Sequence, residues 1–285
     1  MAYTGVRGWG GADWRTTEGE RPMVCANVEP GGRQAGAIAI GVMCKAPIEG
    51  ASKTRLTPPL TPAEAAALSR CFIADTVALA VTAVRELPCD VVAVHTPAGS
   101  EAQFDGVVPA GVGMLAQRGD DLSQRLINAT NDLLGQGYGA VCLMNSDSPT
   151  LPTLIVRRAV ETLRQAPDSL VLGPAIDGGY CLIGLSRAHD WAFKGIAWST
   201  NTVLAETLAR AAAEGVPAVC MPSWYDVDDW VSLDLLLHDV FGAGTGLCDG
   251  FSASAAGHTR DFLERLLATD GDRRRLRVPW ALGPT

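Results

Sequence analysis

The sequence predicts a three-layer α/β/α sandwich with a mostly parallel sheet. From residue 36 onward, short all-apolar runs alternate with longer amphipathic stretches, and this alternation is typical of repeated βαβ units. The short runs are apolar at nearly every position, as expected of parallel strands that are buried on both faces. The stretches between them have the length and the period of surface helices.

The first strand and the first helix are the clearest elements. AIAIGVM at 37–43 predicts a central strand, and the apolar stretch at 61–87 predicts a long helix. Thr61 is the expected N-cap of this helix, with Pro62 at its first position and Glu64 at its third, which is a capping-box arrangement. The polar loop between the two elements therefore joins a strand to a helix.

The alternation continues to about residue 222. The predicted strands are 90–96, 113–119, 140–146, 169–175, 178–185 and 216–222, and the predicted helices are 120–137, 153–166, 199–215, one after residue 229, and 258–268. We divide the chain into a flexible N-terminal leader at 1–35, an α/β domain at 36–242 and a C-terminal extension at 243–285.

Composition excludes several classes of function. The formal net charge is −8 and 47% of the residues are hydrophobic, so we expect a large core and no surface for a nucleic acid polymer or an anionic membrane. We find no signal peptide and no uninterrupted apolar run long enough to span a membrane. The eight cysteines occur singly, without a CxxC pair, and we interpret them as buried thiols of a cytoplasmic protein. The sequence does not predict the oligomeric state.

The loop KAPIEGASKTRL at 45–56 follows the first strand and carries Lys45, Lys53 and Arg55. It is not a Walker A loop, because Ser52 and Pro47 stand where that motif needs its glycines. Lys53 and Arg55, with Gly50 and the backbone amides, suit a di- or triphosphate. The alternative is a solvated loop whose charges only favour solubility.

Acidic residues follow three later strands, where ligands of parallel sheets are expected. Asp147 either holds Mg²⁺ or, with Ser148, caps the helix that starts near Pro152. Asp226 and Asp228 are two positions apart, so in an extended segment both carboxylates can reach one cation. The alternative, for Asp228 and its neighbour Asp229, is capping of the next helix.

The other candidate residues each have a functional and a structural interpretation. In DGGY at 177–180, the two glycines form a hairpin turn or allow a ligand to approach beside Asp177 and Tyr180. The group Asp120, Asp121 and Arg125 binds substrate or caps and solvates a helix. Trp198 covers a base or a sugar ring, or it is a core aromatic. Together, one cationic loop and three acidic loops suggest a nucleotide that is bridged by a divalent ion.

Six motifs in this order resemble the DUF2064 family, which is regarded as a family of glycosyltransferases in the nucleotide-diphospho-sugar transferase (GT-A fold) superfamily. They are KAPIEGASKTRL, GDDLSQRL, NSDSPTL, GPAIDGGYCLIGL, IAWSTNTVLAETLAR and YDVDDWVSLDLL. The resemblance covers residues 36–240 and implies the GT-A fold. The first loop and helix are also similar to those of 2-phospholactate guanylyltransferase, a nucleotidylyltransferase.

The resemblance also implies roles for residues. The nucleotide phosphates would be bound by Lys45, Lys53 and Arg55. Asp147 takes the metal-binding role, and Asp226 with Asp228 lies near the metal or the acceptor. Asp177, Gly178 and Gly179 would line the sugar or acceptor pocket. The chain departs from the family pattern at Ser148, Cys181 and Asp229, none of which is a proposed ligand.

We expect a glycosyltransferase that uses Mg²⁺ or Mn²⁺ to move a sugar from a nucleotide sugar to a small-molecule acceptor, with Asp177 or Asp226 as the base. The first alternative is nucleotidylyl transfer from an NTP to a phosphorylated small molecule, with release of pyrophosphate. The second is a nucleotide-binding protein without catalytic activity.

Overall fold

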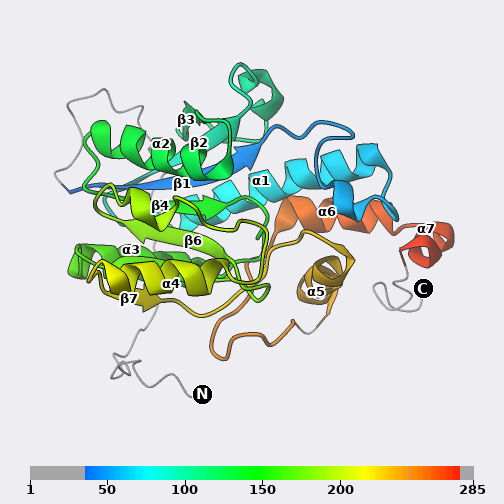
Figure 1. Cartoon of the computed structure of the whole chain (residues 1–285). Coiled ribbons are helices and arrows are strands. Elements are labelled where there is room, and N and C mark those ends of the chain that lie inside the picture. The colour runs from blue at the N-terminus through cyan, green and yellow to red at the C-terminus, as the bar shows by residue number, and fades with distance from the viewer. Residues whose placement is uncertain (1–35, 243, 277–285) are drawn as a thin grey trace.

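A seven-stranded sheet forms the centre of the structure, a computed structural model that describes residues 36–242 and 244–276 (Figure 1). Its strands are β1 (Ile38–Lys45), β2 (Cys89–Thr96), β3 (Gly113–Ala116), β4 (Ala140–Asn145), β5 (Leu170–Pro174), β6 (Tyr180–Leu185) and β7 (Ala218–Cys220). They lie in the order β3-β2-β1-β4-β6-β5-β7. Only β6 runs antiparallel to its neighbours, so the predicted mostly parallel sheet is confirmed. The predicted leader lies outside the described residues.

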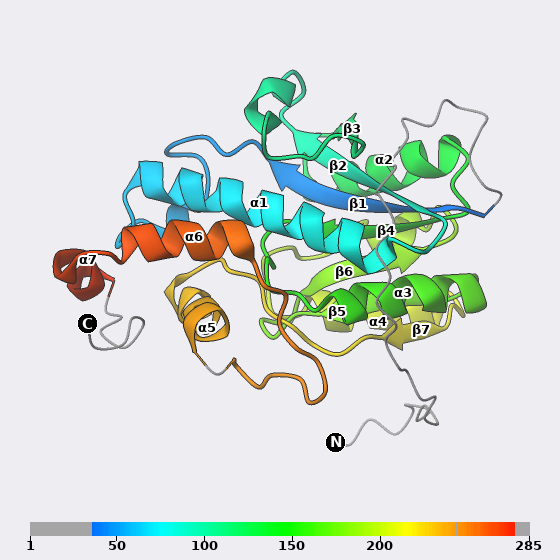
Figure 2. The same cartoon turned by 180° about the vertical axis from the view of Figure 1, so that it is seen from behind.

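Helices cover both faces of this sheet. They are α1 (Pro62–Val84), α2 (Leu122–Gly135), α3 (Thr153–Gln165), α4 (Val203–Ala213), α5 (Trp230–Phe241), α6 (Gly257–Leu266) and α7 (Asp270–Arg275), with single 3₁₀ turns η1 (Thr54–Leu56), η2 (Glu101–Phe104) and η3 (Asp190–Ala192). One core cluster contains residues of α1, α3, α5 and α6, and the other contains residues of α2 and α4. Figure 2 shows α1, α3 and α6 on the face turned away from the viewer in Figure 1. The predicted three-layer sandwich is confirmed.

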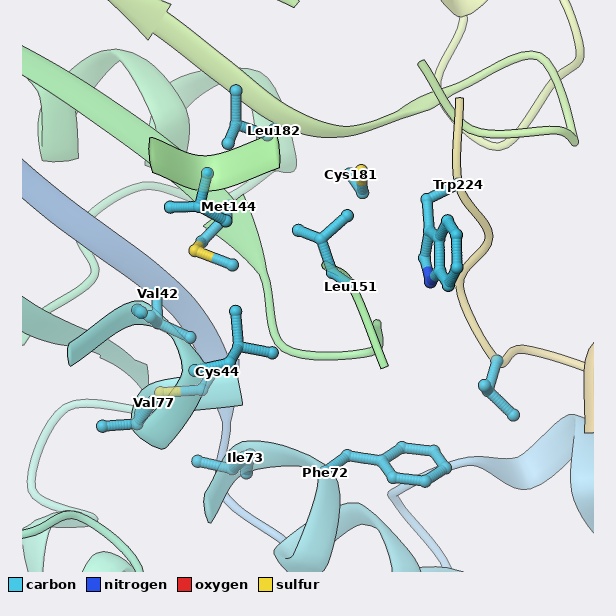
Figure 3. Packing of buried hydrophobic residues seen from close by; sticks show 14 of the residues in the cluster. Val42, Cys44, Phe72, Ile73, Val77, Met144, Leu151, Cys181, Leu182 and Trp224 are labelled. Carbon is cyan, nitrogen blue, oxygen red and sulfur yellow. The ribbon is translucent and has the colours of Figure 1, made fainter. Parts of the chain in front are cut away.

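The apolar run of β1 fills both cores. Ile38, Ile40 and Val42 point to one face, and Ala39 points to the other, because successive side chains of a strand alternate. Figure 3 shows Met144 of β4 between Val42 and Leu182 of β6, as the strand order β1-β4-β6 requires. This burial fixes the position of the loop that leaves β1 at Lys45.

Helix α1 begins as the sequence predicts. Thr61 Oγ1 accepts a hydrogen bond from Glu64 N at 3.2 Å, and Glu64 Oε2 accepts one from Thr61 N at 2.7 Å, so the capping box is present. By length and composition α1 could cross a membrane, although 67% of its apolar window is buried inside the fold. The search of the sequence for an uninterrupted apolar run therefore did not detect α1 as a helix long and apolar enough to span a membrane. The burial of α1 is typical of a core helix.

The chain after residue 243 packs against the sheet domain. The carboxylate of Asp75, on α1, accepts hydrogen bonds from His258 N at 3.0 Å and Thr259 N at 2.8 Å, at the start of α6. Leu263 of α6 is buried in the same core cluster as α1. The described part of the predicted extension therefore shares the core of the preceding domain (Figure 2).

Most differences from the predicted elements lie at their ends. Helix α4 starts at Val203 and not at residue 199, because Ser199 has a left-handed backbone with φ of 62°. Helix α7 was not predicted at all. The expectation of buried thiols is also only partly right: among the seven described cysteines, all free, Cys44, Cys142 and Cys181 are buried but Cys220 is exposed.

Candidate functional site

Four loops that carry the predicted residues meet at one edge of the sheet. They follow the carboxyl ends of β1, β4, β5 and β7, which point in the same direction. Backbone hydrogen bonds join three of these loops: Val227 N donates to Asp147 O at 2.8 Å, and Ile176 N donates to Trp224 O at 2.9 Å. The site is therefore held together by main-chain contacts, which do not depend on the side chains that face it.

At the centre of this edge, Lys53 lies between two carboxylates. Its Nζ is 2.9 Å from Asp147 Oδ1 and 2.8 Å from Asp228 Oδ1. The Lys53 side chain is only 7% exposed, whereas those of Asp147 and Asp228 are 34% and 47% exposed. Nζ also lies 5.7 Å from the ring centroid of Phe72. Two acidic residues that the sequence assigns to one metal site thus meet at a single cationic atom.

The pKa of Lys53 reflects these neighbours. Burial alone would lower it, but the charges of Asp147 and Asp228 and their hydrogen bonds outweigh burial, so the pKa is raised. The lysine is therefore charged over the whole physiological pH range and neutralises part of the acidic charge around it.

The loop after β1 is ordered by Ser52, which sequence reasoning noted only as a mismatch to the Walker A motif. Ser52 is buried; its Oγ donates to Ala46 O at 3.1 Å and accepts from Ile48 N at 3.0 Å. Lys53 follows in a left-handed conformation, with φ of 48°. This turn directs the ammonium towards the acids. A small hydroxyl residue directly before a basic one could have signalled such a turn.

The other cations of the loop lie at its surface. Lys45 is exposed and its Nζ donates to Ala51 O at 2.9 Å. Arg55 is exposed on η1, close enough for its charge to act on Asp229. Gly50 has a positive φ of 72°, and a Cβ there would meet no atom within 4 Å. The loop therefore carries two exposed cations in addition to the buried lysine.

Asp226 shares the site with the other acids. Burial, together with the negative charges of Asp228, Asp177 and Asp147, raises its pKa to about 7. Asp226 therefore interacts with the three other carboxylates. A divalent cation at this site would lower the repulsion between these carboxylates and an anionic nucleotide.

The DGGY segment forms the predicted hairpin between β5 and β6, which pair antiparallel. Asp177 Oδ1 accepts a hydrogen bond from Gly179 N at 2.8 Å and so fixes the turn. Gly178 has φ of 92°, and a Cβ there would lie 2.7 Å from Asn201 Cα. The backbone at residue 201 therefore lies directly against Gly178. The positive φ and this close contact both require a glycine here, and a contact between Gly178 and a ligand stays a prediction.

Two residues predicted on the sugar or acceptor side lie next to each other. The rings of Tyr180 and Trp198 are 6.1 Å apart in an edge-to-face arrangement, and Trp198 Nε1 donates to Ser123 Oγ at 2.7 Å. Burial raises the pKa of Tyr180, so its hydroxyl stays protonated. Arg125, on the same helix as Ser123, donates from Nε to Gly119 O at 3.0 Å and ties α2 to the preceding loop.

The capping alternatives have different outcomes. Asp229 is the N-cap of α5 and forms a capping box with Ser232, so the capping interpretation of Asp229 is correct. Asp121 likewise caps α2. Helix α3, however, has Pro152 as its N-cap and no side-chain capping bond. Capping therefore does not explain Asp147 or Ser148, which leaves the charge interactions of Asp147 as its visible role.

A polar network behind the acids was missed by the sequence interpretation. Tyr225 Oη donates to Asp239 Oδ2 at 2.6 Å and accepts from Thr150 Oγ1 at 2.8 Å. Tyr225 is fully buried, and it precedes Asp226 directly. The network ties the acidic loop to α5 and to the loop after β4. Such partners are far apart in the chain, and no local pattern signals them.

The carboxylate oxygens of Asp147 and Asp228 suit a divalent metal. Among residues 36–242 and 244–276, no group of three or more His, Cys, Asp and Glu side chains has the arrangement of a complete metal centre. Asp147 and Asp228 nevertheless bring two hard oxygen donors to one point. Mg²⁺ commonly uses one or two protein carboxylates and takes its other ligands from water and phosphate oxygens, so this donor set fits.

The fold is the α/β fold of a solved protein from Desulfovibrio desulfuricans G20 described as a proposed nucleotide-diphospho-sugar transferase. The two share 27% sequence identity over 84% of this chain and 96% of that chain, with a TM-score of 0.68. Residues 78–200 match the model of the family "Uncharacterized protein conserved in bacteria (DUF2064)". The resemblance expected from the motifs is thereby confirmed. No curated protein sequence matches the chain.

More distant structures are also similar. A CMP:2-keto-3-deoxy-manno-octonic acid synthetase complexed with CTP shares 11% identity over 70% of this chain and 96% of its own, with a TM-score of 0.47. Rv0371c from Mycobacterium tuberculosis H37Rv shares 16% identity over 72% of this chain and 100% of its own, with a TM-score of 0.46. With TM-scores this low, neither likeness bears on the function of this chain.

Proposed function

We propose that the protein is a metal-dependent glycosyltransferase that moves a sugar from a nucleoside diphosphate to a small-molecule acceptor. The observation that carries this proposal is the convergence of Asp147 and Asp228 on one cation, 2.9 and 2.8 Å from Lys53 Nζ, at the ligand-binding edge of the sheet. The similarity to a proposed nucleotide-diphospho-sugar transferase, at 27% identity, supports the substrate class. We expect the protein to act in the cytoplasm.

Asp147 and Asp228 would hold Mg²⁺ or Mn²⁺, with Asp226 beside them. When bound, such an ion supplies positive charge to the diphosphate oxygens. We expect Lys53, Arg55 and Lys45 to bind the phosphates with Gly50 and so to stabilise the nucleoside diphosphate as it leaves.

The acceptor would enter on the side of the hairpin between β5 and β6. Gly178 and Gly179 lie in this turn, and the neighbouring rings of Tyr180 and Trp198 would pack against a sugar. Asp177 and Asp226 are the carboxylates placed to accept the proton of the acceptor hydroxyl. Arg125 is proposed to contact the nucleotide from α2.

The reaction is tested by incubation of the protein with NTPs and with nucleotide sugars, in the presence of Mn²⁺ and a mixture of small acceptors. Release of a nucleoside diphosphate from a nucleotide sugar is the expected result. Release of pyrophosphate from an NTP would contradict glycosyl transfer and establish nucleotidylyl transfer. Binding of nucleotide without either product would favour a non-catalytic protein.

Asp147→Asn tests the metal assignment. Because the amide cannot neutralise a divalent cation, we expect the increase in Tm that Mn²⁺ and a nucleotide produce in the wild type to disappear. The matched control is Asp168→Asn, an exposed carboxylate paired with Arg187, which should keep the full increase. An unchanged increase in Asp147→Asn would show that the metal does not bind there.

A further inference from the structure

Lys53 occupies the place that a metal between Asp147 and Asp228 would need. Its Nζ uses Oδ1 of both carboxylates, at 2.9 and 2.8 Å. Mg²⁺ takes its oxygen ligands at about 2.0–2.1 Å, so an ion held by the same two oxygens leaves no room for the ammonium. An ion on the outer oxygens would still be repelled by the nearby positive charge.

The contacts of Lys53 hold it in this place while no other cation is present. Its side chain is 7% exposed, its ammonium lies over the ring of Phe72, and its backbone is left-handed. A left-handed conformation is unfavourable for a residue other than glycine, and the two ion pairs offset that cost. If the ion pairs were replaced by a metal, this compensation would be lost and the lysine would be free to turn outward.

We propose that Lys53 is an exchangeable counter-ion: it neutralises Asp147 and Asp228 in the empty site, and a divalent metal displaces it from them. The proposal rests on the metal dependence of the proposed function and adds that metal and lysine exclude each other. Once displaced, the ammonium becomes available to a phosphate oxygen. The metal and the nucleotide therefore each favour the arrangement that binds the other, and metal alone binds weakly.

Binding of Mn²⁺ alone to Lys53→Met tests this competition. Methionine keeps an unbranched side chain over Phe72 and removes the charge. We expect the Kd for Mn²⁺, measured by calorimetry without nucleotide, to fall by about tenfold or more, because a close positive charge no longer competes. Weaker or unchanged binding, including no binding to either protein, would overturn the proposal.

Lys194→Met is the matched control. It is the same substitution with the same change in net charge, at an exposed lysine that pairs with Asp190 on η3. We expect its Kd for Mn²⁺ to equal that of the wild type. An equal strengthening in both variants would trace the effect to net charge and would contradict the competition at Lys53.

A measurement on the wild type covers the case in which Lys53→Met does not fold. The chain has three lysines, Lys45, Lys53 and Lys194, so NMR with selectively labelled lysine gives a spectrum that can be assigned from single variants. Titration with diamagnetic Mg²⁺ should shift and sharpen the Lys53 signal alone, as the ammonium leaves the two carboxylates. A Lys53 signal that stays unchanged up to high Mg²⁺ concentration would contradict displacement.

Failure of the exchange between Lys53 and the metal can be distinguished from failure of the proposed function. If nucleoside diphosphate is released with Mn²⁺ but Lys53→Met binds Mn²⁺ no better than the wild type, the exchange is wrong and the transferase assignment stands. If Lys53 exchanges with the metal but no nucleotide sugar is consumed, the transferase assignment is wrong and the exchange stands.

Discussion

Glu64 is one carboxylate that stabilises two distant parts of the chain. Its Oε2 accepts hydrogen bonds from Thr61 N, within the capping box, and from Arg275 Nη1 at 2.8 Å. Its Oε1 accepts from Arg275 Nη2, also at 2.8 Å. Burial opposes ionisation, but the bonds with Arg275 and Thr61 outweigh it and hold the pKa of Glu64 below its usual value.

Glu64→Gln is therefore expected to make stability depend less on pH. The carboxylate has a lowered pKa in the folded protein, so its contribution is present above its unfolded pKa, near 4.3, and is lost as the pH falls further. At pH 7 the variant should lose about 1 kcal/mol of unfolding free energy. Towards pH 3 the difference should shrink.

Urea unfolding of both proteins at several pH values measures this difference. Glu264→Gln, at an exposed position on α6, is the control and should follow the wild type at each pH. A loss in Glu64→Gln that is the same at pH 3 and pH 7 would show that the carboxylate charge does not contribute.

The sequence predicts those side-chain contacts that join residues close to each other along the chain. Thr61 and Glu64 are three positions apart, so their capping box could be inferred. The partners of Lys53 could not, because Asp228 is 175 positions away and nothing local distinguishes a lysine that binds acids from one that binds phosphate. The proximity of Asp226 to the three other acids was likewise visible only in the folded chain.

The hairpin between β5 and β6 is the element with the tightest backbone packing at the site. Gly178 and Gly137 have almost the same φ, 92° and 93°, but a Cβ at Gly178 would collide with the backbone of Asn201, whereas one at Gly137 would meet no atom within 4 Å. Leu204 N also donates to Gly178 O at 2.9 Å. The hairpin is therefore fixed against the start of α4.

Substitution of Gly137 and Gly178 by alanine distinguishes the cost of a positive φ from the cost of a steric clash with another segment. Gly137→Ala should cost about 1 kcal/mol, the usual effect of a side chain at positive φ. Gly178→Ala should cost roughly 2 kcal/mol more, because the loop at 201 must also move. Chemical unfolding of the two variants tests the difference. Equal losses would mean that the contact with Asn201 adjusts without cost.

Among the elements, the long periodic ones were predicted best. The apolar runs of β1 and β4 and the capped α1 have strong local signals, and their ends differ from the predictions by only a few residues. The reversed direction of β6 could be inferred from the Gly-Gly turn, but its place between β4 and β5 could not. Helix α7, DGDRRR, has no apolar face, so no periodic pattern marks it.

The segment at 244–276 is joined to the sheet domain through Asp75. This carboxylate is buried and accepts two backbone N–H groups at the start of α6. The sequence suggested an extension outside the domain because residues after 242 lack the family motifs. Asp75 lies within an apolar helix, and no local pattern shows that its partner is another helix.

Asp75→Ala should loosen this attachment. One buried and one part-buried N–H group lose their acceptor, so we expect a loss of about 2 kcal/mol in unfolding free energy. Hydrogen exchange of the α6 amides should accelerate while that of β1 and β4 changes much less. Asp75→Asn, which keeps one acceptor oxygen, should lie between the two. Unchanged protection of α6 in Asp75→Ala would show that the apolar contacts suffice.

The spacing of the site along the chain has a consequence for biosynthesis. Lys53 is translated early, but Asp147 follows it by 94 residues (147 minus 53) and Asp228 by 175. While the chain leaves the ribosome, β1 and α1 emerge long before the acids that neutralise this lysine. A nascent chain therefore has a period in which a cation destined for burial must stay in water, and the site closes only after the strand β7 has been made.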